Sequence, residues 1–264
     1  MTPPPEPRLH ILHATDWKDA VIALLEPRSP YRPWRSDYGS TVEGSVLAYV
    51  LDTDPPTILT IFGRMGADGA AFDHSVQNSN LLELSSLAML FGLEWAVTDS
   101  WHLVGEDVVT LEDALTASRF GSRPESRFGH STMAAARILL RYDGTCDGCE
   151  ETIDISGSDA REEIFAHTVD LPSRKLPMTQ DWTYDWPAVI CRKCLQAMAE
   201  GGFTSFLDFK FGLHPPCPRC AARRTQRTFY GMPSDFGNIE PWNHAGGCCP
   251  SSESWRCGMC GIEW

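Results

Sequence analysis

No stretch of the 264-residue sequence approaches the roughly 20 consecutive apolar residues that a membrane-spanning helix needs. Its proline-rich start, MTPPPEPR, also lacks the basic and then apolar pattern of a secretion signal. These absences lead us to expect a cytoplasmic protein with no membrane partner. Apart from its cysteine pairs the chain has no evident internal repeat, and it has no low-complexity segment.

Basic residues are scarce, and the deficit is uneven. Lys and Arg number 22 against 35 Asp and Glu, a formal charge of −13. Residues 1–120 carry seven basic and seventeen acidic residues, so we expect phosphate backbones to repel this part. The one clearly basic stretch is 201–230, where Asp208 is the sole acidic residue. We predict that the basic residues of this stretch contact nucleic acid; they are Lys210, Arg219, Arg223, Arg224 and Arg227. The alternative is that they form a solvated strand face.

The rest of the composition is that of a globular α+β chain. Hydrophobic residues make up 42% of the sequence and include nine tryptophans, enough for packed cores. Apolar periodicity and turn signals predict helices within 17–25, 81–91, 110–118 and 131–142, and strands within 8–14, 45–52, 57–63 and 101–105. The polar segment 121–130 lacks periodicity, and we place a domain boundary there.

Eight of the ten cysteines form four C-x-x-C pairs, a spacing typical of metal ligands. A tight knuckle turn lets both thiolates of a pair hold one zinc ion, and two pairs complete a tetrahedron. Sequence order predicts two structural zinc ions, one held by Cys146, Cys149, Cys191 and Cys194 and the other by Cys217, Cys220, Cys257 and Cys260. Redox disulfides and an interleaved choice of ligands are the alternatives. We expect the remaining two, Cys248 and Cys249, to be buried thiols.

The first site lies in a distinctive order of elements: a helix, RYDGTCDGC, the strand-like IFAHTVD, then WPAVICRKC opening a helix. Over residues 131–200 this order resembles the zinc-bearing HNH nucleases, which have a treble-clef ββα-metal fold. The resemblance implies that His167 is the general base that activates water for attack on a phosphodiester. It also implies a bound Mg or Mn ion that stabilises the leaving oxygen.

Three positions depart from that family's pattern. Ala166 stands where the family has an acidic residue, Trp186 near its asparagine, and Leu195 at its last metal-binding histidine. The sequence therefore shows no catalytic magnesium site, although Asp170 and Asp185 are candidate substitutes. A structural zinc site is the interpretation we favour over an active nuclease.

Two further resemblances complete the chain. CPRC and WRCGMCGIEW, with TQRTFYGM between them, resemble a zinc ribbon. Over residues 8–115, the segments RLHILHAT, YRPWRSDYG and EGSVLAYVLDTDPPTILTIFG resemble an EVE or related PUA-like domain, whose members hold a modified base in an aromatic-walled pocket. The resemblance implies a ligand pocket walled by Trp34, Trp95 and Trp101, with Asp52 reading the edge of the base.

We therefore predict an α+β protein in three parts. These are a PUA-like small barrel with helices (1–120), an HNH-like treble clef (121–213) and a zinc ribbon (214–264). The leading hypothesis is a zinc-binding nucleic-acid recognition protein, with DNA favoured and modified DNA as a candidate target. The alternatives are a modification-dependent HNH-type endonuclease and a non-catalytic, zinc-stabilised adaptor that binds a protein partner.

Overall fold

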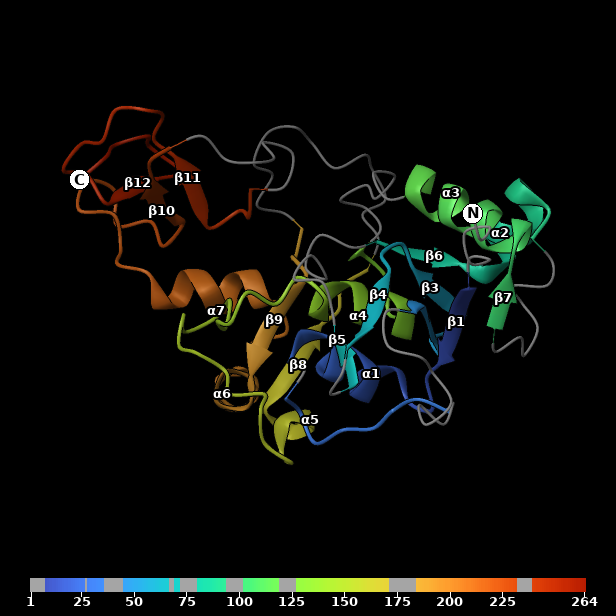
Figure 1. The fold of residues 1–264 in the computed structure, drawn as a ribbon. Coiled ribbons are helices and arrows are strands. Elements are labelled where there is room, and N and C mark those ends of the chain that lie inside the picture. Colours follow the sequence, from blue (N-terminus) through green and yellow to red (C-terminus); the bar gives the residue numbers. More distant parts are fainter. Residues whose placement is uncertain are drawn as a thin grey trace.

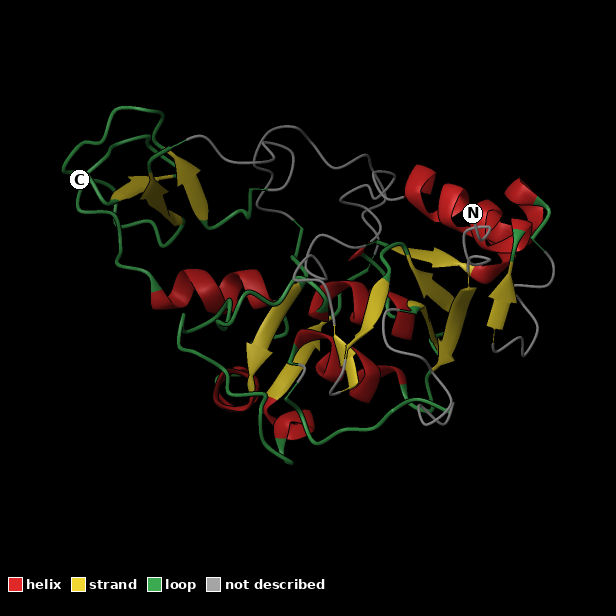
Figure 2. Ribbon diagram, in the orientation of Figure 1, coloured by secondary structure: helices red, strands yellow, loops and turns green. Residues whose placement is uncertain are grey.

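The structure is a computed structural model that describes residues 8–26, 28–35, 45–66, 69–71, 80–93, 102–118, 127–170, 184–231 and 239–264. Within these ranges seven helices and three small sheets form a mixed α+β fold (Figures 1 and 2). No helix in them has the length and apolar character to cross a bilayer. The predicted α+β class is confirmed at this level.

The largest sheet is open rather than closed. Its strands are β1 (Arg8–His13), β2 (Val46–Leu51), β3 (Thr57–Leu59), β4 (Gly63–Gly66), β5 (Gly69–Ala71), β6 (Leu81–Glu83) and β7 (His102–Val104). Its main path runs β5-β4-β2-β1-β7, with β3 paired to β2 and β6 to β3. β1 and β2 are parallel, which requires a crossover connection, whereas the other pairs are antiparallel. The predicted small barrel is therefore wrong for the described residues, which contain no closed barrel.

Both faces of this sheet are covered. Side chains alternate along β2, so that Leu47 and Tyr49 enter one core while Ala48 and Val50 enter another. The crossover helix α1 (Trp17–Leu25) packs in the first core. The second core is filled by the helices α2 (Leu84–Phe91) and α3 (Glu106–Ser118).

Local sequence signals set the ends of these helices. Asp16 caps α1 by accepting hydrogen bonds from the backbone N–H groups of Lys18 and Asp19. Gly92 ends α2 in the left-handed conformation, with φ of 68°, which glycine adopts without steric cost. Leu81 lies in β6 and not in the predicted helix, because its backbone pairs with β3.

A second group of elements begins with the helix α4 (Thr132–Leu139), whose N-terminus is capped by Ser131. The antiparallel pair β8 (Ile164–His167) and β9 (Ala188–Cys191) leads into α6 (Arg192–Glu200). The short α5 (Ala160–Glu163) precedes β8, and α7 (Phe206–Leu213) follows α6. The order of two strands and a helix agrees with the prediction, whereas a treble clef as such stays a prediction.

The C-terminal residues form a three-stranded sheet in the order β11-β10-β12. Its strands are β10 (Thr225–Phe229), β11 (Asn243–Ala245) and β12 (Trp255–Cys257). Figure 1 shows this sheet at the end of the molecule remote from α2 and α3.

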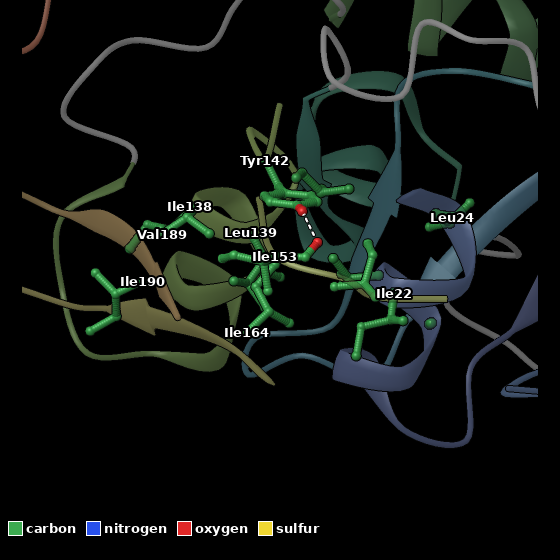
Figure 3. Packing of buried hydrophobic residues seen from close by; sticks show 14 of the residues in the cluster. Ile22, Leu24, Ile138, Leu139, Tyr142, Ile153, Ile164, Val189 and Ile190 are labelled. Atoms are coloured by element: carbon green, nitrogen blue, oxygen red, sulfur yellow. Dashed lines mark hydrogen bonds between the residues drawn. The ribbon is translucent and has the colours of Figure 1, made fainter. Parts of the chain in front are cut away.

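The first core, which we call the main core, crosses the predicted domain boundary at 121–130. It includes Ile22 and Leu24 of α1, and also Ile138 of α4 and Val189 and Ile190 of β9 (Figure 3). Further along the chain it reaches Trp242. The boundaries stay predictions, but residues on both sides of the first one bury the same apolar surface.

Candidate metal centres

The first cysteine cluster is assembled by two segments of the second group of elements. Cys146 and Cys149 lie in a knuckle turn after α4, whereas Cys191 ends β9 and Cys194 lies in the first turn of α6. Cys191 also caps α6, since its sulfur accepts the N–H of Cys194. Cys146, Cys191 and Cys194 are buried within the main core, so this cluster is an internal part of the fold.

The second cluster joins a turn to the C-terminal sheet. Cys217 and Cys220 lie in the knuckle before β10, Cys257 ends β12 and Cys260 lies in the next turn. Cys257 and Cys217 are buried, whereas Cys220 is exposed, so one side of this cluster faces solvent.

Both clusters have sulfur spacings that are compatible with zinc. A tetrahedral ion with zinc–sulfur bonds of about 2.3 Å places its sulfurs about 3.8 Å apart. The Sγ atoms of Cys149 and Cys191 are 3.8 Å apart, those of Cys217 and Cys260 3.6 Å, and those of Cys220 and Cys257 3.6 Å. In each cluster all four sulfurs lie within 4.8 Å of one another. Two sets of four cysteines compatible with two zinc ions are thus present, grouped as the sequence order predicts.

Backbone N–H groups point at the sulfurs and favour the thiolate form. Cys191 donates its N–H to the sulfur of Cys146 at 3.2 Å, and Cys260 donates to Cys257 at 3.4 Å. The pKa of the Cys146 thiol is lowered, and the largest cause is a hydrogen bond from Cys194. Backbone N–H groups lower this pKa further, whereas burial acts in the opposite direction. Zinc binds thiolates, and the N–H groups directed at Cys146 stabilise this form at that sulfur.

The remaining two cysteines differ from expectation. None of the ten cysteines forms a disulfide, and Cys248 and Cys249 are exposed rather than buried. They lie in the connection between β11 and β12, outside both clusters. Within the described ranges no third group of His, Cys, Asp or Glu side chains has the geometry of a metal site.

His167 ends β8, where its Nε2 atom lies 2.8 Å from Asp185 Oδ2. The other carboxylate oxygen of Asp185 accepts hydrogen bonds from the N–H groups of Trp186 and Leu207 and from the Ser205 hydroxyl. Hydrogen bonds with His167 and Leu207 outweigh burial and lower the pKa of Asp185. This carboxylate therefore connects the end of β8 to the start of α7, and the catalytic role of His167 stays a prediction.

Asp170 lies apart from this pair. Its carboxylate is 3.2 Å from His130 Nε2, and His130 Nδ1 is 2.9 Å from the Thr168 hydroxyl. The two candidate substitute carboxylates thus contact different histidines.

The five predicted phosphate-binding residues have three different environments. Lys210 is only 1% exposed, so the prediction of a phosphate contact is wrong for this residue in the described conformation. Arg224 pairs with Asp208 and Arg227 with Glu150. Arg219 and Arg223 are exposed, and neither forms an ion pair with a described residue.

The predicted ligand pocket is divided by the structure. Trp34 is buried in the main core, where its ring lies 5.4 Å from that of Tyr49, so it does not wall an open pocket. Asp52 lines a cavity of about 330 Å³ together with His13 and Arg35, and burial raises the pKa of its carboxyl. No aromatic ring other than His13 is among the described residues of this lining. The other two predicted walls, Trp95 and Trp101, lie outside the described residues.

Two polar residues lie beside the first cluster, of which sequence reasoning did not single out Asp147 and gave Lys210 a different role. Asp147 is inside the knuckle and accepts the N–H of Val189 at 2.6 Å, and burial raises its pKa to about 7. Lys210 donates from Nζ to the Gly148 carbonyl at 3.0 Å. The sequence held a signal for Lys210, since a lysine four residues after Phe206 and three after Leu207 lies on the apolar face of its helix.

No protein-family model, no curated protein and no solved structure matches this chain. The resemblances to HNH nucleases and to EVE or PUA-like domains therefore have no support from known proteins.

Proposed function

We propose that this chain is a zinc-binding nucleic-acid recognition protein whose second metal centre contacts the phosphate backbone. One observation carries the proposal. Arg219 lies between the two cysteines of the exposed knuckle and Arg223 follows it, and both guanidinium groups are free of ion pairs with described residues. Guanidinium groups bind phosphates bidentately, and a metal knuckle holds their backbone in place.

The position of these arginines favours the same function. The opposing knuckle carries Met259, whose side chain is 64% exposed. Both knuckles converge on one set of four sulfurs, so the arginines and an exposed apolar tip share one end of the molecule. This end is remote from α2 and α3, and these two helices belong to the strongly acidic residues 1–120 (Figure 1). Repulsion between that part and a duplex falls off over a screening length of about 8–10 Å at physiological salt.

The test is retention of duplex and single-stranded DNA by the zinc-loaded protein over a range of salt concentrations. The variant Arg219→Ala/Arg223→Ala should weaken binding uniformly across sequences and reduce the slope of log K against log salt by about 1–2, since each phosphate contact contributes about 0.9. Arg192→Ala is the matched control, because that exposed arginine already pairs with Glu163. An unchanged slope, or no binding at low salt with both metals present, would refute the proposal and favour the adaptor alternative.

Endonuclease activity is the second candidate, on the observation that His167 and Asp185 form a hydrogen-bonded pair. A base oriented by a carboxylate is typical of activated-water catalysis. The test is cleavage of plain and base-modified DNA with Mg²⁺ or Mn²⁺. Cleavage that His167→Ala abolishes, with two zinc ions still bound, would support it. The absence of cleavage on all substrates would leave the pair a structural link between β8 and α7.

A further inference from the structure

A buried ammonium group lies next to the first cluster. Lys210 is on α7 in the segment FLDFKFGL, and its side chain is 2% exposed. Its Nζ atom has two hydrogen-bond acceptors, the Gly148 carbonyl oxygen at 3.0 Å and Glu150 Oε1 at 2.9 Å. The Trp242 ring centroid lies 6.0 Å from the same atom. Lysine is seldom buried to this extent unless its charge is matched, so the groups around it require explanation.

The first acceptor belongs to the knuckle itself. Gly148 lies between Cys146 and Cys149, and a side chain at this position would meet the Cys194 sulfur at 2.8 Å. Because Lys210 donates to the carbonyl of Gly148, it holds the backbone that presents two of the four sulfurs. Four thiolates and one Zn²⁺ ion carry a formal charge of −2, which an adjacent buried cation stabilises because the local dielectric constant is low.

The second acceptor extends the contact toward the C-terminal sheet. Glu150 follows Cys149 in the left-handed conformation, with φ of 62°, and its N–H donates to the Cys146 carbonyl at 2.8 Å. Its second oxygen accepts from Arg227 Nη1. Arg227 lies on β10, whose residue Thr225 is in register with Cys257 of the second cluster. The path from one metal knuckle to the sheet of the other thus consists of three charged side chains.

We propose that Lys210 is a positioning residue of the first metal site, and that the chain Lys210–Glu150–Arg227 couples metal binding at the two sites. Metal at the second cluster orders β10 and β12 and holds Arg227 against Glu150. Glu150 in turn holds Lys210 on the knuckle. By thermodynamic reciprocity, metal at the first site must favour metal at the second by the same factor.

The positioning role is tested by competition between the full-length protein and a zinc chelator. The double variant Cys257→Ser/Cys260→Ser disables the second site, so the measured affinity belongs to the first. In that background Lys210→Met should lower the zinc affinity at least tenfold, since it removes both the charge and the carbonyl contact, and Lys210→Arg should restore part of it. The thiolate-to-metal charge-transfer bands of the Co²⁺-loaded protein should shift in Lys210→Met. Equal affinities and unshifted bands would overturn this role.

The coupling is tested with a variant that keeps the core intact, since the Arg227 side chain is 57% exposed. Disabling the second site should lower the affinity of the first about three- to fivefold, a modest effect because the Arg227–Glu150 pair is partly solvated. When Arg227→Ala is present, disabling the second site should not change the zinc affinity of the first site. Arg223→Ala, a neighbouring exposed arginine without a described ion pair, should preserve the wild-type difference. A first-site affinity that does not depend on the second site in wild type, or an equal dependence in Arg227→Ala, would overturn the coupling.

Discussion

At the scale of single residues, Arg161 joins α1 to the part of the chain that contains the first cysteine cluster. Its guanidinium binds both oxygens of Asp16, at 2.7 and 3.0 Å, and Asp19 at 2.6 Å. These hydrogen bonds are the main cause of the lowered pKa of Asp16, which also caps α1. We predict that Arg161→Ala lowers the free energy of unfolding by about 1 kcal/mol, a small value because the groups are partly exposed. Urea unfolding of the zinc-loaded protein measures it.

The control for this prediction is Arg161→Lys. Lysine keeps the charge but lacks the planar fork that contacts two carboxylates together, so it should recover less than half of the loss. Full recovery would mean that charge alone matters and that the bidentate geometry contributes nothing.

The limits of sequence reasoning are also visible at this scale. The grouping of eight cysteines into two clusters compatible with metal ions could be predicted, because ligand spacing is a local property that chemistry fixes. The partners of Lys210 and Trp34 could not, because they lie on segments distant in sequence, the knuckle for Lys210 and β2 for Trp34. Helical spacing can place a residue on an apolar face, but it does not identify the distant group that the residue contacts.

At the scale of elements, the first knuckle tolerates no side chain at Gly148. An added Cβ would lie 2.8 Å from the Cys194 sulfur and 3.3 Å from the Phe209 ring. We predict that Gly148→Ala reduces zinc bound per chain from two ions toward one, because the knuckle must shift away from α6 to relieve the clash. Metal analysis after gel filtration measures the zinc content, and Gly148→Ala should cause no further loss of zinc when Cys146→Ser has already disabled the first site.

Gly212 in α7 provides the matched substitution. A Cβ there would approach nothing closer than the Phe203 ring at 3.7 Å, an ordinary contact. Gly212→Ala should therefore leave both zinc ions bound and raise stability by about 0.5–1 kcal/mol through helix propensity. Equal zinc loss in both variants would show that the close approach at Gly148 is not the cause.

The elements themselves could be predicted where one local signal dominates. Residues 17–25 form the expected helix behind the Asp16 cap, and the runs around 46–51 and 57–59 pair as expected. The parallel pairing of β1 with β2 could not be predicted, since it joins Leu9 to Val46 across a helix and a long connection. Short apolar strands suit an open sheet and a barrel equally well, and only such long-range pairs distinguish the two.

At the scale of the whole molecule, the main core decides how the chain should unfold. This core runs from Leu12 in β1 to Trp242 near the C-terminal sheet and includes Cys146, Cys191 and Cys194. A chain cut at 121–130 would expose apolar surface on both sides, at about 25 cal/mol for each Å². The predicted boundary at 121–130 therefore crosses a core that both sides share.

We accordingly predict one cooperative thermal transition for the elements from β1 to α7. Loss of the first metal site in Cys146→Ser should lower the hydrogen-exchange protection of α1 and β2 as well as that of α6, because these elements share the core. Cys260→Ser, which removes a partly exposed ligand of the second site, should release protection in β10 and β12 and leave β2 nearly unchanged. Hydrogen exchange resolved by segment measures both responses. If β2 keeps its protection in Cys146→Ser while α6 loses it, the boundary at 121–130 separates independent folding units and the shared core is not cooperative.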